Sequence, residues 1–118
     1  MSMADVTIWH NPRCSKSRGA YEILQDRGVD LDVVRYLDDA PTRDELERVL
    51  ALLGTDDVTA IARTGEARWK ELGLGVADRD TILDAMVANP ILIERPIVIR
   101  GDRAVVGRPP EKVLELLD

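Results

Sequence analysis

The chain has 118 residues, a formal net charge of -6 and a single cysteine. A chain of this length is typical of one domain with one core, and it needs no disulfide or metal to fold. The acidic excess argues against non-specific binding to nucleic acid or membrane surfaces, because both are polyanionic. No apolar run could span a bilayer, Met1 to Asp5 lacks the features of a signal peptide, and a lone cysteine fits a reducing compartment. We therefore expect a cytoplasmic protein.

The first third of the sequence predicts a βαβ unit. Residues 6–10 form a β-branched run that leads into a turn at Asn11-Pro12. Residues 15–27 have the pattern of a helix, which Gly28 ends. Residues 31–37 are mostly apolar, as expected for a strand buried on both faces. Two strands joined by one helix are expected to run parallel.

The middle of the chain is predicted to be helical. Thr42 and Glu45 have the spacing of a capping box, and the helix that follows buries Leu46, Val49, Leu50 and Leu53 before Gly54 ends it. Short helical stretches are expected at 58–63 and 67–72. A further helix is expected at about 79–88, after Asp78 as its N-cap and before Pro90.

The last third predicts two strands and a helix. Residues 97–100 and 104–106 flank Gly101-Asp102, a two-residue hairpin turn. Pro109-Pro110 can begin a final helix that buries Val113, Leu114 and Leu117. The predicted order is therefore β-α-β, a helical block, and β-β-α.

The most informative stretch is His10-Asn-Pro-Arg-Cys-Ser-Lys-Ser-Arg18. It places Cys14 where the first strand gives way to a helix. The N-terminus of a helix has unpaired N–H groups and a partial positive charge, so it favours a thiolate over a thiol. Arg13, Lys16 and Arg18 add three nearby cations. We interpret Cys14 as a reactive thiolate rather than a small buried hydrophobic residue.

Two neighbours of Cys14 have open roles in this interpretation. His10 either holds the thiolate or shuttles a proton, or it lies exposed at the end of a strand. Ser17 occupies the second position of a C-x-x-C pair, and we expect it to face solvent as an ordinary helix serine. Without a second thiol, any redox cycle must use a thiol from another molecule.

Two other classes of cysteine site are disfavoured. One His and one Cys cannot supply a closed zinc ligand set. The arginine of a C-x5-R phosphatase loop is replaced by Ala20. Cations for a bound oxyanion must therefore come from distant parts of the chain. The candidates are Arg63, Arg68, Arg95, Arg100, Arg103 and Arg108. Arg95 and Arg108 are notable because they lie at the ends of predicted elements.

A set of motifs then extends over nearly the whole chain. The motifs are His10-Asn-Pro-Arg-Cys14, Tyr36-Leu37, Pro41-Thr-Arg-Asp-Glu-Leu46, Ala60-Ile-Ala-Arg63, Glu71-Leu-Gly-Leu74, residues 89–98 and Gly107-Arg-Pro-Pro110. With them, the chain resembles the ArsC family of glutaredoxin-linked arsenate reductases and its uncharacterised close relatives, and more distantly Spx-like proteins. Established reductases of this family tend to carry Gly-Thr after the cysteine, where this chain has Ser15-Lys16.

The resemblance implies an α/β, thioredoxin-like (glutaredoxin-like) fold. Its four-stranded mixed sheet would be built as βαβ–ββα, with a helical insertion at about 42–90 inside a single domain of residues 1–118. It also implies that Cys14 is the nucleophile and His10 its neighbour in the active site. Arg63, Arg95 and Arg108 would bind the oxyanion, and Pro96 would follow a cis peptide bond.

The function implied by the resemblance is reduction of arsenate to arsenite. Glutathione would be a co-substrate and glutaredoxin a partner, with no bound cofactor or metal, and we expect a monomer. Two alternatives stay open at this point. One is a Spx-like regulator that binds RNA polymerase, although such proteins usually carry C-x-x-C where this chain has C-x-x-S. The other is a monothiol glutaredoxin-like oxidoreductase that acts on glutathione mixed disulfides.

Overall fold

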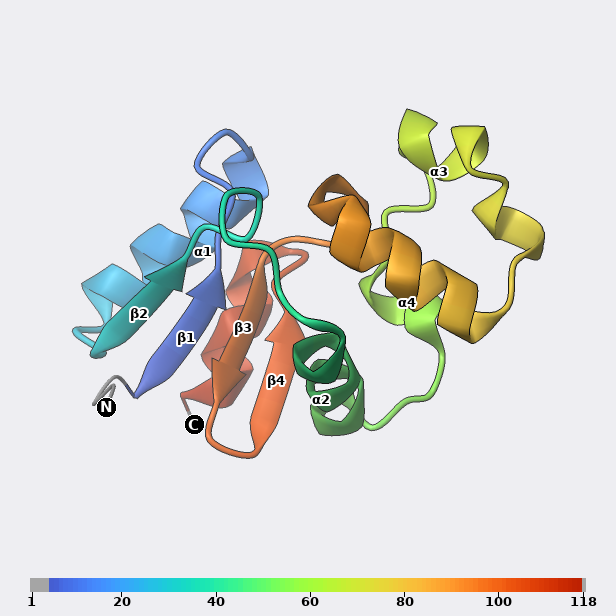
Figure 1. Cartoon of the computed structure of the whole chain (residues 1–118). Helices are drawn as coiled ribbons and strands as arrows, with labels where there is room; N and C mark the ends of the chain where they lie inside the picture. Colours follow the sequence, from blue (N-terminus) through green and yellow to red (C-terminus); the bar gives the residue numbers. More distant parts are fainter. Residues whose placement is uncertain (1–4, 118) are drawn as a thin grey trace. The chain divides into compact units, whose positions relative to one another are not determined.

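The computed structural model describes residues 5–117, which form two compact units (Figure 1). The first unit combines residues 5–39 with residues 95–117, and the second consists of residues 40–94. The elements in chain order are β1 (Val6–Trp9), α1 (Ser15–Asp26), β2 (Leu31–Val34), α2 (Arg43–Leu53), η1 (Val58–Ile61), α3 (Ala67–Glu71), η2 (Leu74–Val76), α4 (Arg79–Ala88), η3 (Pro90–Leu92), β3 (Ile97–Arg100), β4 (Arg103–Val106) and η4 (Pro110–Leu116). Within residues 5–117, no helix has the length and apolarity that a membrane span requires.

The first unit contains the four-stranded mixed sheet that the sequence predicts. The strand order is β2-β1-β3-β4, with β1 parallel to β2 and antiparallel to β3, and with β3 antiparallel to β4. The register pairs Trp9 with Ile97 and Ile97 with Val106. The C-terminal ends of β1 and β4 therefore lie at the same end of the sheet, measured along the strands, as the start of β3.

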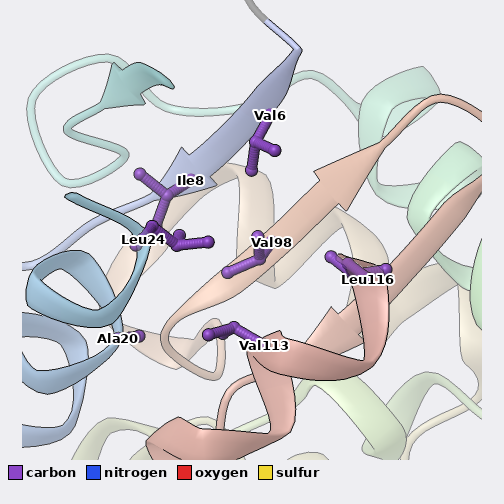
Figure 2. Packing of buried hydrophobic residues seen from close by; sticks show 7 residues of the cluster. All are labelled: Val6, Ile8, Ala20, Leu24, Val98, Val113 and Leu116. Atoms are coloured by element: carbon purple, nitrogen blue, oxygen red, sulfur yellow. The ribbon is translucent and has the colours of Figure 1, made fainter. Parts of the chain in front are cut away.

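The core of the first unit lies where α1 and η4 pack against one face of this sheet (Figure 2). Side chains alternate along a strand, so Val6 and Ile8 of β1 share that face with Val98 of β3. The complete cluster is Val6, Ile8, Ala20, Leu24, Val98, Val113 and Leu116. Full burial of a Val, Leu or Ile side chain stabilises the fold by about 1.5–3 kcal/mol. This cluster anchors α1, and with it the residues at its N-terminus.

The prediction for the second strand was wrong in two respects. β2 ends at Val34, and residues 35–39 form a turn in which the N–H groups of Asp38 and Asp39 donate to the carbonyl of Arg35. β2 is also an edge strand and is not buried on both faces, since Val33 is 38% exposed. An apolar run alone does not distinguish a central strand from an edge strand.

The last helix is also different from the prediction. η4 is a 3-10 helix in which Val113 and Leu116 are buried, while Leu114 and Leu117 are only half-buried. A 3-10 helix has three residues per turn, so residues three apart share one face. The expected α-helical pattern of Val113, Leu114 and Leu117 therefore does not apply.

The second unit is helical, as predicted. Thr42 caps α2 in a capping box with Glu45, whose N–H donates to Thr42 Oγ1 at 3.2 Å. Asp78 caps α4 by accepting from the N–H of Thr81 at 2.8 Å. Gly54 ends α2 with a positive φ of 75°. The buried side chains of the two packed helices are Leu46, Val49 and Leu50 from α2 and Ile82, Leu83 and Met86 from α4, and Leu53 is only half-buried.

A short backbone pairing closes the second unit. Ala62 and Ile93 form an isolated antiparallel bridge. Next to it, the N–H of Arg63 donates to Leu92 O at 2.8 Å and the N–H of Glu94 donates to Ile61 O at 2.7 Å. The predicted helical insertion at about 42–90 falls within this unit. That residues 1–118 form one domain stays a prediction, and residues 1–4 and 118 lie outside the described residues.

Candidate active site

The loop between β1 and α1 is braced by several hydrogen bonds. The carbonyl of Asn11 accepts from the N–H of Cys14 at 3.0 Å, and Asn11 Oδ1 accepts from the N–H of Arg13 at 3.0 Å. Arg18 Nη1 donates to the carbonyl of Pro12 at 3.0 Å. These contacts fix the backbone that leads into Cys14.

Cys14 is the N-cap residue of α1 and is half-buried. Its side chain does not cap the helix with a hydrogen bond, yet the pKa of its thiol lies below the ordinary value. Partial burial raises the pKa of the thiol, but the N–H groups of Ser17 and Lys16 and the Arg95 guanidinium lower it by more. The sulfur therefore favours the thiolate, as its place at a helix N-terminus predicts.

Arg95 is one of the predicted oxyanion ligands, and it lies beside Cys14. It immediately precedes β3, whose first residue pairs with the last residue of β1. Its guanidinium lowers the pKa of Cys14 by its charge and by a side-chain hydrogen bond. The Nε and Nη1 atoms of Arg95 are buried. The Arg95-Pro96 peptide bond is cis, as expected.

Arg108 lies on the loop next to Arg95. The N–H of Gly107 donates to the carbonyl of Pro96 at 2.9 Å. A Cβ atom on Gly107 would lie 2.8 Å from Pro96 Cγ, so the close approach of the two loops requires glycine here. The Arg108-Pro109 bond is a second cis peptide, which the sequence did not predict. Arg108 is exposed and follows β4, so it lies at the same end of the strands as Cys14 and Arg95.

Arg63 belongs to the second unit. It follows the Ala62–Ile93 bridge and forms an ion pair with Glu66, with Arg63 Nη1 and Glu66 Oε2 3.0 Å apart. That Arg63 joins the other two arginines on one oxyanion stays a prediction.

The remaining candidate arginines are held by other groups. Arg68 pairs with Glu71 and donates to Asn89. Arg100 pairs with Asp5, and Arg103 donates to the carbonyl of Glu115.

The predicted environments of Ser17 and His10 need correction. Ser17 was expected to face solvent, but it is fully buried, and His10 is only 7% exposed. His10 Nδ1 lies 2.7 Å from Ser17 Oγ, which also accepts from the N–H of Asn11 at 3.0 Å. The His10 ring stacks on Tyr21 with a centroid separation of 5.2 Å. The spacing of Ser17 from the buried Ala20 was the sequence signal for this burial.

His10 has a lowered pKa. Burial is the main cause, followed by the charges of Arg35 and Arg18. The neutral form of the ring is therefore favoured. The Asn11 N–H donates to Ser17 Oγ, and Ser17 Oγ and His10 Nδ1 share a hydrogen bond. A catalytic role for His10 stays a prediction.

A cavity of about 290 Å³ lies beside the β1–α1 loop. Its lining includes His10, Arg13, Arg35, Leu37 and Asp38. Arg35 and Asp38 were not among the predicted site residues. The signal was the parallel pairing of β1 and β2, which places the segments that follow both strands at one edge of the sheet. Among residues 5–117, no three His, Cys, Asp or Glu side chains gather as metal ligands would.

Comparison with known proteins assigns a family to this arrangement. The statistical model described as "ArsC family" matches residues 9–116. The chain belongs to the ArsC family. Its similarity to individual members of this family extends over nearly its full length. A protein named arsenate reductase from Neisseria meningitidis serogroup A is 42% identical over 117 residues, which are 98% of this chain and 100% of that protein.

Solved structures agree with this assignment. The structure described as arsenate reductase from Vibrio cholerae has a TM-score of 0.91 and 43% identity, and the match covers 97% of this chain and 98% of that chain. A glutaredoxin from Archaeoglobus fulgidus has a TM-score of 0.50 at 20% identity, covering 98% of this chain and 88% of that chain, and it bears on the fold alone. The predicted thioredoxin-like fold is confirmed.

Proposed function

We propose that this ArsC-family chain reduces arsenate to arsenite, with Cys14 as nucleophile, glutathione as co-substrate and glutaredoxin as partner. The observation that carries the proposal is the half-buried Cys14 thiol, whose pKa is lowered by α1 and Arg95 despite the opposing effect of burial. Proteins named arsenate reductase are similar to the chain over nearly its full length. These reductants belong to a reducing compartment, so we place the reaction in the cytoplasm.

Attack on arsenate requires positive charge around the sulfur. Arsenate carries nearly two negative charges near neutral pH, and two unit charges about 4 Å apart interact by roughly 4 kcal/mol at an effective dielectric constant of 20. Arg95 already contacts Cys14, and Arg108 lies on the adjacent loop. Guanidinium groups of Arg63, Arg95 and Arg108 would offset this repulsion and hold the oxygens with paired hydrogen bonds.

The reaction balances in two steps before glutaredoxin acts. The Cys14 thiolate forms a bond to arsenic(V), and one arsenate oxygen leaves as water after protonation. The glutathione thiolate then attacks the Cys14 sulfur, and the electron pair of the S–As bond leaves with arsenic. Arsenic(V) is thereby reduced to arsenite, and Cys14 and glutathione are oxidised to a mixed disulfide. A glutaredoxin thiol attacks the glutathione sulfur and restores the Cys14 thiolate.

An external thiol is needed because the chain cannot resolve the adduct itself. It has one cysteine, and Ser17 stands where a C-x-x-C pair has its second thiol. Ser17 is also engaged with His10 and with the N–H of Asn11. Its hydroxyl therefore holds the β1–α1 loop in place and takes no part in the redox chemistry.

The test is a coupled assay on the purified chain. Arsenate, glutathione, glutaredoxin and glutathione reductase should give NADPH consumption that depends on arsenate, and Cys14→Ser should abolish it. Activity only on a glutathionylated peptide would replace the proposal with the monothiol glutaredoxin-like alternative. Binding to the RNA polymerase α-subunit without turnover of either substrate would favour the Spx-like alternative.

A titration of Cys14 tests the site without turnover. The rate of alkylation by iodoacetamide should rise with pH through a midpoint below that of free cysteine, whose pKa is about 8.5. Arsenate or phosphate should slow alkylation if an anion binds beside the sulfur. A midpoint at the free-cysteine value would contradict the assignment of Cys14 as nucleophile.

A further inference from the structure

We propose that the cavity beside Cys14 is the site for glutathione, with Arg13 and Arg35 holding a peptide carboxylate. The inference rests on the proposed function, because it assigns a place to the co-substrate of that reaction. It concerns a different set of residues from the arginines of the oxyanion.

The cavity lies beside the loop that leads into Cys14. Its lining includes Arg13, whose Cα is about 3.8 Å from that of its neighbour Cys14. Arg35, Leu37 and Asp38 come from the turn after β2. A volume of about 290 Å³ is at the lower limit for small-molecule pockets, which start near about 300 Å³. The cavity can therefore take one end of a tripeptide, and the proposal places the thiol of that tripeptide outside the cavity, at Cys14.

The sheet order separates this cavity from the arginines that would hold arsenate. β1 lies between β2 and β3. Arg95 precedes β3 and Arg108 follows β4, whereas the cavity is lined by the segments that follow β1 and β2. Glutathione must attack the Cys14 sulfur while arsenic is still bound to it. Two sites on opposite sides of β1 allow both reactants to reach the sulfur together.

The charges of the lining suit a peptide carboxylate. Arg13 and Arg35 carry two positive charges, Asp38 carries one negative charge and His10 is neutral, so these groups sum to +1 in a chain of net charge -6. Guanidinium groups bind carboxylates with paired hydrogen bonds. The charge of the lining therefore suits a peptide carboxylate, and the phosphate arm of the experiment below distinguishes such a ligand from a simple anion.

A binding experiment with a non-reactive ligand tests the site directly. S-methylglutathione has no free thiol, so its binding to the full chain can be followed by the amide chemical shifts of residues 10, 11, 13 and 35–38. We expect Arg13→Gln and Arg35→Gln each to raise the dissociation constant by up to about fivefold, and the double variant by about tenfold or more. Arg27→Gln is the matched control, because Arg27 is an exposed arginine outside the cavity, and it should bind like the wild type.

Truncated ligands identify what the arginines recognise. Removing or esterifying the carboxylates of S-methylglutathione should abolish the difference between wild type and the double variant. If the affinity is the same with and without the carboxylates, or the arginine variants bind like wild type, the proposal is wrong. Displacement by phosphate at the same concentration as the peptide would show a simple anion site and would also overturn it.

Kinetics distinguish this proposal from the proposed function. In the arsenate assay, Arg13→Gln and Arg35→Gln should raise KM for glutathione several-fold and leave KM for arsenate unchanged. Arsenate reduction with an unaltered KM for glutathione would refute the cavity and leave the function standing. Binding of S-methylglutathione by a chain without arsenate activity would refute the function and leave the cavity standing.

Discussion

The two compact units of this chain are stabilised by different kinds of contact. In the first unit, the sheet pairs residues far apart in sequence, such as Thr7 with Ile99, and α1 and η4 cover one face. In the second unit, short helices are capped by side chains that accept from N–H groups only two or three residues further along the chain. Asp57 accepts from Thr59, and Asp78 accepts from Thr81. Ion pairs such as that between Arg43 and Asp84 then join helices.

This difference explains where the candidate chemistry lies. Cys14, Arg95 and the cavity all belong to the first unit. They lie at one end of its strands, whose register is set by backbone pairing. Of the three arginines proposed to bind the oxyanion, the second unit contributes Arg63, which follows an isolated bridge. Segments that leave the paired strands at the same end are held close together. Residues of the first unit alone, such as Arg95, can therefore lower the pKa of Cys14.

The largest effect should come from truncating the core of each unit. Leu24 of α1 and Leu83 of α4 are both fully buried. Leu24→Ala and Leu83→Ala should each lower the free energy of unfolding by about 2–5 kcal/mol, from lost burial and the cavity left behind. The number of transitions that calorimetry shows for each variant then tells whether the two units unfold together.

The exposed Leu72 provides the control for this comparison. Leu72→Ala, at a side chain 40% exposed, should change stability by no more than about 0.5 kcal/mol. If residues 1–118 form one domain, both core variants will shift a single transition. Two separate transitions, each moved by only one variant, would contradict the single-domain prediction.

Arginine variants test the division of roles between the units. A hydrogen bond to a charged group contributes about 1.5–3 kcal/mol, so Arg95→Gln and Arg63→Gln should each reduce kcat/KM for arsenate by about 10- to 100-fold. Only Arg95→Gln should also raise the midpoint of Cys14 alkylation, because Arg95 is the arginine that lowers its pKa.

The exposed Arg68 is the matched control in the second unit. Arg68→Gln should retain wild-type kcat/KM. An Arg63→Gln variant with wild-type kinetics would remove Arg63 from the site and restrict the chemistry to the first unit.

Local patterns predicted the fold where the cause of structure was local. The capping box of Thr42 and Glu45 and the strand-to-helix junction at Cys14 depend on neighbouring residues, and both were predicted. The position of β2 at the lateral edge of the sheet depends on strand order, which no local pattern contains. Arg35 and Asp38 were missed although the predicted parallel pairing of β1 and β2 already placed them near the end of β1.

Ser17 marks the boundary between these cases. Its burial followed from its spacing to Ala20, but its partner His10 lies on a different element. The sequence could therefore have indicated the burial of Ser17 and not its hydrogen bond.

A smaller effect is expected from Ser17→Ala. The variant leaves the part-buried N–H of Asn11 and the buried Nδ1 of His10 without the hydroxyl that now bonds both. An unsatisfied buried polar group costs about 1–3 kcal/mol, so urea unfolding should show a loss within that range. Ser15→Ala is the matched control, since Ser15 is exposed in the first turn of the same helix, and it should lose little. Equal losses in both variants would show that the His10–Ser17 contact adds nothing to stability.

The smallest effect should be the pH dependence that His10 gives the first unit. Its pKa is lowered in the folded chain, so between the folded and unfolded pKa values the unfolded chain binds more protons. Stability should therefore fall as the pH is lowered below about 6.5, the ordinary pKa of histidine. The carboxyls of Glu47, Asp57 and Asp78 also have lowered pKa values, but their contribution is lost only at more acidic pH, from about 4.5 downwards. The Cys14 thiol also has a lowered pKa and contributes to the decline with falling pH. Urea unfolding at pH 7.5, 6.5 and 5.5 should therefore show a steeper decline in the wild type than in His10→Gln, and equal slopes would mean that His10 does not contribute.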